Sequence, residues 1–292
     1  MTCYVIIIVF AQKNCKGEIS VYENIFGKEE DMFEKFVYDG TMCSEYGIIC
    51  AYFGKEGLIT PEAQKTDLKT EQALRGNTFN IISQDYSEPL SYTMQIVNKD
   101  FSPITSIQER ALKKWLCQRG KYNWFCILNE RYADTWFHAN ISNPKMEYFY
   151  GSYGMELTIN TDAPYAYSDP RTVTANFKAG EILESLYVDN DEEMPIYPVL
   201  TITPASAGTI TLKNLSLPEK DNTLIIKNCT AGEVITLDCN MPLAISSNQN
   251  HNIYNDFNLW WPYLIDGYNR ITVDKDCVVK LEYREYRKVG IV

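Results

Sequence analysis

The sequence predicts a mainly β protein, with an α+β first domain that holds one main helix and a second domain that is a β-sandwich. Three observations support this fold class. Between Asp221 and Leu281, short β-branched runs alternate with turn residues at spacings of about ten residues, as in antiparallel sandwiches. Ser91 to Val97 and Met155 to Ile159 alternate apolar and polar residues with period two. A clear helical period is confined to Ile107 to Arg119.

The composition is that of a globular protein that neither spans a membrane nor binds nucleic acid strongly. The 292 residues suit one large or two ordinary domains, and 45% hydrophobic residues are ample for their cores. The 27 basic and 38 acidic side chains give a net charge of -11, which argues against binding by neutralisation of phosphates. No apolar run approaches the roughly 18 to 20 residues of a membrane-spanning helix. The nine cysteines include no C-x-x-C pair, so we expect reduced, structural thiols.

Residues 1–31 do not resemble the rest of the chain. Tyr4 to Ala11 is apolar but short, and no basic residue precedes it, so a secretory signal is poorly supported. Codons for Lys28-Glu29-Glu30 can read as a purine-rich ribosome-binding sequence just before Met32. We therefore expect residues 1–31 to be a non-native leader, and the alternative is an extra N-terminal strand.

The first domain is predicted to begin with two strands between Phe33 and Phe53. A turn at Asp39-Gly40 separates them, and Gly47 interrupts the second strand as a bulge would. In the later strand from Ser91 to Val97, the apolar residues share one face. These patterns predict a β-barrel or sandwich.

The helix from Ile107 to Arg119 carries its own start and stop signals. Ser106 and Glu109 form a capping-box pattern, and Gly120 stands where a left-handed C-terminal cap belongs. Its apolar face is expected to hold Ile107, Ala111, Leu112, Trp115 and Leu116. The basic face opposite either contacts a neighbouring subunit or is solvated.

After the helix, further strands are expected at Trp124 to Leu128, Trp136 to Asn140, Glu147 to Tyr150 and Met155 to Ile159. Thr161 to Asp169, with Pro164, breaks the pattern and predicts a semi-rigid connection. We therefore assign residues 32–160 to the first domain and 161–282 to the second. The charged segment 283–292 ends the chain, and the sequence leaves open whether its strand returns to complete the first domain.

The second domain is predicted to be a two-sheet sandwich of the jelly-roll or galectin-like kind. Asp189-Asn190-Asp191-Glu192-Glu193 is its densest acidic cluster, which lacks the glycine and the distant glutamate of a calcium loop. We expect a solvated loop there. The strands outside the stretch from Asp221 to Leu281 are expected at Val173 to Phe177, Glu184 to Tyr187, Val199 to Thr203 and Thr209 to Lys213.

Nothing in the sequence selects a catalytic, cofactor or metal site. His138 and His251 are the two histidines and lie far apart in the chain, so a nucleophile-base pair is poorly supported. No Cys/His pairs stand at zinc-ligand spacing, and no Gly-rich phosphate loop occurs. The sequence therefore predicts a protein that is not an enzyme.

One loop combines amide side chains with aromatic rings. Such groups bind sugars, because amides hydrogen-bond the hydroxyls while a ring stacks on the apolar face of the sugar. The alternatives are a partner contact, or a long loop whose tryptophans anchor it to the core. The candidate residues for a sugar or partner contact are Asn248, Asn250, Asn252, Tyr254, Trp260 and Trp261.

Four short motifs resemble the distal tail protein family of long-tailed bacteriophages. They are Phe36 to Gly40 with Ser44 to Ile49, Asp162 to Tyr167, Gly232 to Asp238 and Trp261 to Val273. Their order and spacing cover most of the chain from Met32 onward. The resemblance implies a structural component of a phage or prophage tail tip, the hub that joins the tail tube to the adsorption apparatus.

The resemblance also implies partners and a location. The first domain would form a homomeric ring, commonly a hexamer, around a pore through which DNA passes without specific binding. Its neighbours would be the tail tube protein and the tail tip or receptor-binding proteins, in the virion tail after assembly in the bacterial host cytoplasm. The alternative function is a carbohydrate-binding protein that acts through the C-terminal sandwich.

Overall fold

The computed structural model of the chain describes residues 34–54, 66–73, 78–128, 132–149 and 152–289. It confirms a mainly β protein with two domains, each built on its own hydrophobic core. The predicted leader or extra strand in residues 1–31 lies outside the described residues. Within the described ranges, no helix is long and apolar enough to cross a membrane.

The first domain is a curved, antiparallel seven-stranded sheet with the order β2-β1-β7-β8-β9-β6-β3. Glu34 and Cys50 exchange backbone hydrogen bonds of 3.1 and 2.9 Å, which joins the start of β1 to β3 and closes the sheet into a barrel. The strands are β1 (Lys35–Tyr38), β2 (Thr41–Met42), β3 (Ile48–Gly54), β6 (Ser91–Asn98), β7 (Asn123–Leu128), β8 (Phe137–Phe149) and β9 (Ser152–Thr161).

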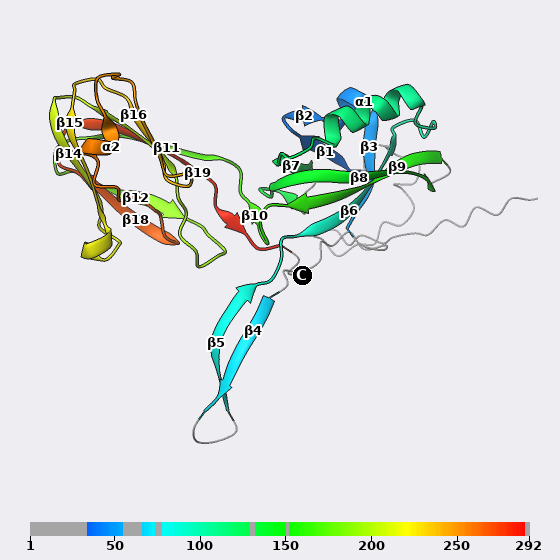
Figure 1. The fold of residues 1–292 in the computed structure, drawn as a ribbon, viewed down its shortest axis with the longest axis horizontal. Helices are drawn as coiled ribbons and strands as arrows, with labels where there is room; N and C mark the ends of the chain where they lie inside the picture. The colour runs from blue at the N-terminus through cyan, green and yellow to red at the C-terminus, as the bar shows by residue number, and fades with distance from the viewer. Residues whose placement is uncertain (1–33, 55–65, 74–77, 129–131, 150–151, 290–292) are drawn as a thin grey trace, which may run out of the picture.

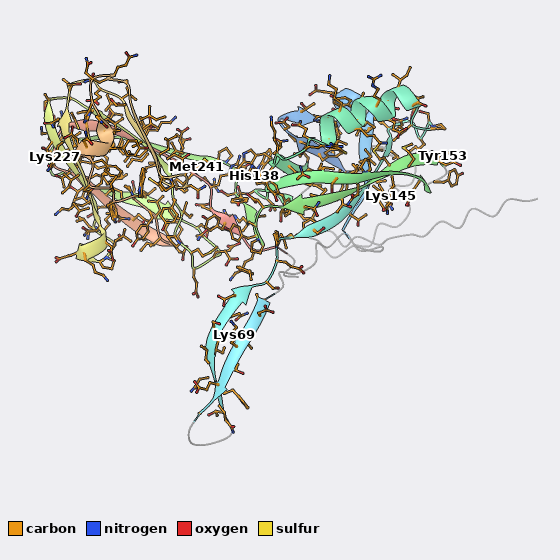
Figure 2. The ribbon with its side chains drawn as sticks, in the orientation of Figure 1. Lys69, His138, Lys145, Tyr153, Lys227 and Met241 are labelled. Atoms are coloured by element: carbon orange, nitrogen blue, oxygen red, sulfur yellow. The ribbon has the colours of Figure 1, made fainter. Side chains whose placement is uncertain are left out.

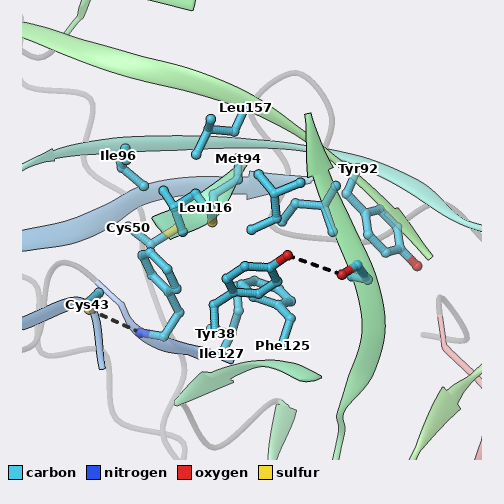
Figure 3. Packing of buried hydrophobic residues seen from close by; sticks show 14 of the residues in the cluster. Tyr38, Cys43, Cys50, Tyr92, Met94, Ile96, Leu116, Phe125, Ile127 and Leu157 are labelled. Carbon is cyan, nitrogen blue, oxygen red and sulfur yellow. Dashed lines mark hydrogen bonds between the residues drawn. The ribbon is translucent and has the colours of Figure 1, made fainter. Parts of the chain in front are cut away.

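The core of this domain lies between the curved sheet and helix α1 (Ser106–Leu116) (Figures 1 and 3). Trp115 is its centre: the indole stacks on Tyr46 at 4.4 Å between ring centroids and on Phe36 at 5.9 Å. Its Nε1 donates a 3.2 Å hydrogen bond to the carbonyl of Tyr38. A buried indole with its polar atom paired stabilises the contact between helix and sheet.

The helix exists where it was predicted, but it ends at Leu116 with Cys117 as its C-cap, not at Arg119 with Gly120 as the cap, and its N-cap and faces also differ. Thr105, not Ser106, is the N-cap, and its Oγ1 accepts from the amide of Gln108 at 3.3 Å. Ile107 is 86% exposed and Ala111 is also exposed, whereas we expected both on the buried face. The buried residues of α1 are Leu112, Trp115 and Leu116, so the apolar face of the helix is narrower than the predicted one.

Some strand predictions were also wrong in their bounds. The strands predicted at Trp136 to Asn140 and at Glu147 to Tyr150 merge into one long strand, β8 (Phe137–Phe149), because its partner β9 pairs along both parts; Trp136 stands just before it, and Tyr150 lies outside the described residues. Gly47 is not a bulge; at φ +68° it ends the 3-10 turn Cys43–Tyr46, and β3 begins one residue later. The turn at Asp39-Gly40 is confirmed, with φ angles of 52° and 71°.

The second domain is a sandwich of two antiparallel sheets, with the orders β11-β19-β13-β16-β17 and β12-β18-β14-β15. The alternating residues that face inward form the core, among them Leu200, Ile210, Ile226 and Leu237, each 0% exposed. The strands are β11 (Arg171–Phe177), β12 (Ile182–Val188), β13 (Val199–Pro204), β14 (Gly208–Asn214), β15 (Thr223–Cys229), β16 (Ile235–Asp238), β17 (Leu243–Ser246), β18 (Gly267–Val273) and β19 (Cys277–Tyr283), with the short helix α2 (Ile253–Asp256). Whether it is galectin-like stays a prediction.

The end of the chain returns to the first domain. Strand β20 (Tyr286–Arg287) pairs with β10 (Ala166–Tyr167), and Trp136 exchanges two 2.7 Å backbone hydrogen bonds with Tyr167. Val289 is then buried in the first core. The second domain therefore lies in the chain between two adjacent segments that both contact the first.

The acidic cluster from Asp189 to Glu193 is only in part the solvated loop that we expected, since Asp189, Asp191 and Glu193 are exposed but the other two residues are not. Asn190 and Glu192 are 8% and 7% exposed. Asn190 Oδ1 accepts from the amide of Tyr286 at 2.7 Å, and Asp191 Oδ2 accepts from that of Lys288 at 2.9 Å. The loop is packed because it supplies acceptors for the returning end of the chain.

We expect Trp115→Ala to destabilise the first domain by about 3 to 5 kcal/mol, the range for emptying the site of a buried tryptophan. Ile107→Ala in the same helix is the matched control and should change the unfolding free energy by no more than about 0.5 kcal/mol, because Ile107 is exposed. Urea unfolding monitored by circular dichroism measures both. Equal losses in the two variants would contradict the packing described.

Candidate functional site

His251 lies among acidic groups and a serine, but they do not form a Ser-His-acid triad. The His251 ring is buried, and its Nδ1 lies 2.5 Å from Glu233 Oε1. Its Nε2 lies 3.3 Å from Asp256 Oδ2 but is not aligned to form a hydrogen bond with it. Ser246 Oγ donates to the same Glu233 oxygen at 2.5 Å and not to the histidine, so the order of a Ser-His-acid triad is missing. Although burial opposes its ionisation, hydrogen bonds from Ser246, Thr230 and His251 hold the pKa of Glu233 below its usual value.

The predicted sugar or partner residues lie in and around helix α2 of the second domain, and several of their groups hold the loop in place. Asn248 Oδ1 accepts from the amide of Asn250 at 3.0 Å, and the Tyr254 hydroxyl accepts from that of Ala244 at 2.9 Å. Asn252 is the N-cap position of α2. Trp260 and Trp261 pack against the second core, as the anchoring alternative expected. A sugar or partner contact there stays a proposal.

The junction between the domains holds two arginines and two carboxylates that come from distant parts of the chain. Arg287 Nη2 lies 2.8 Å from both Asp134 Oδ2 and Glu285 Oε2. Arg171 donates to the same two oxygens, at 3.1 Å to Asp134 and 3.3 Å to Glu285. The Glu285 side chain is only 5% exposed. Shared oxygens and burial make this a strongly coupled network that fixes the position of the returning strand.

A second arginine contact lies beside this network. The Arg284 guanidinium stands 4.0 Å from the ring centroid of Trp124 and 5.4 Å from that of Trp136. Its Nη1 donates to the carbonyl of Ser168 at 2.5 Å. Burial lowers the pKa of Arg284, yet the two rings and nearby carboxylates favour its charged form. The contact connects the second domain to the aromatic strands of the first.

Tyrosines complete the junction. Tyr165 lies 4.6 Å from Tyr286 and 5.5 Å from Tyr167, measured between ring centroids. The Tyr86 hydroxyl donates a 2.6 Å hydrogen bond to Glu192 Oε1, which links the first domain to the loop of the second. Burial, together with nearby acidic groups, raises the pKa of Tyr167 and Tyr165 well above the ordinary range, so these hydroxyls keep their protons and act as donors.

A projecting hairpin is the second distinctive feature. It consists of β4 (Thr66–Gln72) and β5 (Phe79–Tyr86), and it extends away from both domains (Figures 1 and 2). Every residue of β4 is exposed. The large apolar side chains of the hairpin are also open to solvent: Leu68 is 54%, Phe79 63%, Ile81 65% and Ile82 63% exposed. An exposed apolar surface of this kind marks an interaction site.

The sequence analysis missed both features, for different reasons. The hairpin carries a short signal, because Phe79-Asn80-Ile81 alternates in polarity and Gly76-Asn77 stands before it as a turn pair. The junction carries none that is local. Asp134, Arg171 and Arg287 meet only because the chain crosses between the domains twice.

Comparisons relate the chain to phage tail proteins. Residues 32–163 match a family described as phage tail protein N-terminal domain, and residues 165–283 one described as phage tail C-terminal domain. YomH, an uncharacterized protein derived from the SPbeta prophage of Bacillus subtilis strain 168, is 29% identical over 121 residues, or 41% of this chain and 47% of YomH. The match thus spans about half the length of this curated relative.

A solved structure extends this likeness to the fold. The crystal structure of SPP1 Dit, described as a paradigm of the hub adsorption apparatus in phages that infect Gram-positive bacteria, has a TM-score of 0.61 to this chain. The alignment covers 86% of this chain and 98% of SPP1 Dit, at 11% sequence identity. At that identity the comparison shows a shared two-domain fold.

We expect Glu285→Ala to destabilise the protein by about 3 kcal/mol, because it removes the carboxylate, only 5% exposed, that pairs with Arg287, itself 14% exposed, and with the more exposed Arg171. Glu282→Ala is the matched control: its carboxylate pairs with Lys280 at 2.8 Å but is 44% exposed, so the loss should stay below about 1 kcal/mol. Chemical unfolding of the two variants measures the difference. A loss for Glu285→Ala no larger than that of the control would contradict the role of the network.

The junction should also weaken in acid. Partial burial opposes ionisation of Asp134, but hydrogen bonds from Arg287 and the Asp169 amide outweigh it and hold its pKa below the ordinary 3.8. Since the folded-state pKa is depressed, the contribution is complete above about pH 5 and is lost as the pH falls through the folded-state pKa. Asp134→Asn should therefore cost stability at neutral pH and progressively less below about pH 4. Urea titrations from pH 3 to pH 7 measure this; a constant difference down to pH 3 would contradict it.

Proposed function

This chain belongs to the phage tail proteins whose N-terminal and C-terminal domain families it matches, and we propose that it acts as the distal tail hub. In this role it joins the tail tube to the adsorption apparatus. It is a structural component and not an enzyme. The fold that it shares with SPP1 Dit supports the assignment, because the likeness extends over both domains.

The observation that carries this proposal is the uncovered hairpin on the first domain. A two-stranded hairpin is marginally stable on its own, and this one exposes apolar side chains along its length. It therefore needs a surface to bind. A hub at the end of a tube repeats one interface around an axis, and a head-to-tail interface whose rotation closes gives a ring. The number of six subunits follows from the resemblance to distal tail proteins.

In this arrangement the first domains surround the pore and the second domains point outward. The tail tube protein would bind one side of the ring, and the tip or receptor-binding proteins the other. The net charge of -11 suits a pore through which DNA slides without specific binding, because acidic groups repel phosphates. Assembly would take place in the bacterial host cytoplasm, before the protein becomes part of the virion tail.

The loop from Asn248 to Trp261 supports a narrower role in the second domain. Within the loop, Tyr254 is 45% and Leu259 57% exposed, so its surface suits a docked tail protein. Carbohydrate binding is the alternative function of the same loop. The packing of both tryptophans against the core favours the protein partner, because stacking on a sugar requires a free ring face.

We expect cryo-electron microscopy of tails that contain this protein to show a closed homomeric ring at the junction between tube and tip. The first domains should surround the channel, and the second domains should lie outside. Rings with the second domains at the channel would contradict the arrangement, and a single copy on the tail axis would contradict the hub itself. Purified protein at high concentration is a second sample for the same measurement.

A further inference from the structure

Two tyrosines stand side by side on the outer surface of strands β12 and β18 in the second domain (Figure 1). Tyr187 lies opposite Tyr268 in the pairing of these strands, and their ring centroids are 5.0 Å apart in an edge-to-face contact. Tyr187 is 54% and Tyr268 66% exposed, although Leu186 and Asn269 beside them in the strands are buried. A large aromatic area thus faces water over a closed core.

A β-bulge places a charged pair next to these rings. The register of β12 on β18 shifts between Leu183 and Leu186. Glu184 and Ser185 therefore both stand opposite Arg270, where a regular ladder would place one residue. Both residues of the bulge are exposed, and Arg270 Nη2 donates a 3.0 Å hydrogen bond to Glu184 Oε1. The bulge thus turns a carboxylate to the same surface as the guanidinium.

The tyrosines and the charged pair form one continuous surface. Tyr268 and Arg270 are alternate residues of β18, so their side chains leave the same face, roughly 7 Å apart at about 3.3 Å per residue. Ser216 Oγ donates to the carbonyl of Tyr268 at 2.9 Å and accepts from the amide of Arg270 at 3.1 Å, which holds this part of the strand in place. We call the surface of Tyr187, Tyr268, Glu184 and Arg270 the tyrosine platform.

The chemistry of the tyrosine platform matches a neutral pyranose sugar. The apolar face of such a sugar stacks on an aromatic ring, and its hydroxyls need both donors and acceptors beside that ring. A guanidinium supplies donors only and a carboxylate acceptors only, so the pair of Arg270 and Glu184 supplies both. Because Arg270 is already paired and the chain carries a net charge of -11, an anionic polymer is disfavoured.

We propose that the tyrosine platform binds a polysaccharide of neutral pyranose sugars. Tyr268, the more exposed ring, stacks on one sugar, and Tyr187 packs against Tyr268 and fixes the orientation of its ring. Arg270 donates to the hydroxyls of this sugar and Glu184 accepts from them. Since β12 is an edge strand of its sheet, a long polymer can continue past the platform on that side.

This site is separate from the loop between Asn248 and Trp261. There the two tryptophans pack against the core, whereas Tyr187 and Tyr268 belong to neither core. The activity goes beyond that of the hub and does not depend on it. In the proposed hub the second domains point outward, so the polysaccharide would be one on the surface of the host cell.

An array of neutral oligosaccharides built from glucose, galactose, mannose, rhamnose, N-acetylglucosamine and N-acetylgalactosamine tests the binding with the full chain. We expect at least one to bind at submillimolar concentration, and calorimetry with the same soluble oligosaccharide gives the dissociation constant. Tyr268→Ala should raise this constant about tenfold, and Tyr268→Phe should largely preserve it because the ring remains. Tyr153→Ala is the matched control and should have little effect, since Tyr153 is 54% exposed and pairs with Tyr148 at 5.2 Å in the first domain.

A second pair of variants tests the charged groups. Glu184→Ala should also weaken binding about tenfold, because it removes the acceptor for the hydroxyls. Glu282→Ala removes another exposed carboxylate that pairs with a cation, Lys280, and should leave the affinity unchanged. Glu184 and Tyr268 are both exposed, so the thermal midpoints of these variants should equal that of the unaltered chain.

The outcomes separate this site from the loop and from the hub. Absence of binding to every oligosaccharide overturns the proposal. Binding that survives Tyr268→Ala but is lost in Tyr254→Ala places the sugar at the loop, which overturns the platform. Tails with Tyr268→Ala that lack a neighbouring tail protein would make the platform a protein contact, which also overturns it. None of these results removes the ring at the junction between tube and tip, and absence of that ring overturns the hub alone.

Discussion

The buried carboxylate of Glu285 is the point on which the arrangement of the two domains depends. It accepts hydrogen bonds from Arg171, from Arg287 and from the amide of Asp189, at the place where the chain leaves the second domain. A charge that is removed from water is tolerated only when partners satisfy it, so these groups must all be present together. Ser168, which is 0% exposed, closes the site by accepting from the amide of Glu285.

The end of the chain is part of the first domain. The first core includes Val289, which follows the whole sandwich in the chain. In the sequence, segments of the first domain therefore stand both before and after the second domain. The chain crosses between the two domains twice, and both crossings connect the sandwich to the first domain. Two anchored crossings restrict rotation between the domains more than a single tether would.

The exposed apolar surfaces are formed by the side chains that neither hydrophobic core buries. In α1, the side chains of Leu112, Trp115 and Leu116 are buried in the first core, whereas Ile107 and Ala111 are exposed to solvent. In the second domain, Trp260 and Trp261 are used by the sandwich, which leaves Tyr254 and Leu259 at the surface of the loop. In the hairpin, the side chains of Leu68, Phe79, Ile81 and Ile82 are all exposed and belong to neither core. Free apolar groups thus lie on both domains, as expected for a component with several neighbours in an assembly.

The sequence by itself determined the elements whose signals are local. Period-two alternation predicted β6 and β9, with Tyr92, Met94, Met155 and Leu157 buried as expected. The turn at Asp39-Gly40 and the position of the helix followed from the conformational preferences of a few adjacent residues. The mainly β class and the resemblance to distal tail proteins were likewise available before any coordinates.

Tertiary structure alone decided the face of the helix, the union of two predicted strands in β8, and the use of the acidic loop. Each depends on a partner far away in the chain: β9 extends β8, and the returning residues Tyr286 and Lys288 give Asn190 and Asp191 their donors. Asp134 and Arg287 are 2.8 Å apart across more than a hundred residues of sequence. No local propensity encodes such a contact, because its energy exists only after both cores have brought the two groups together.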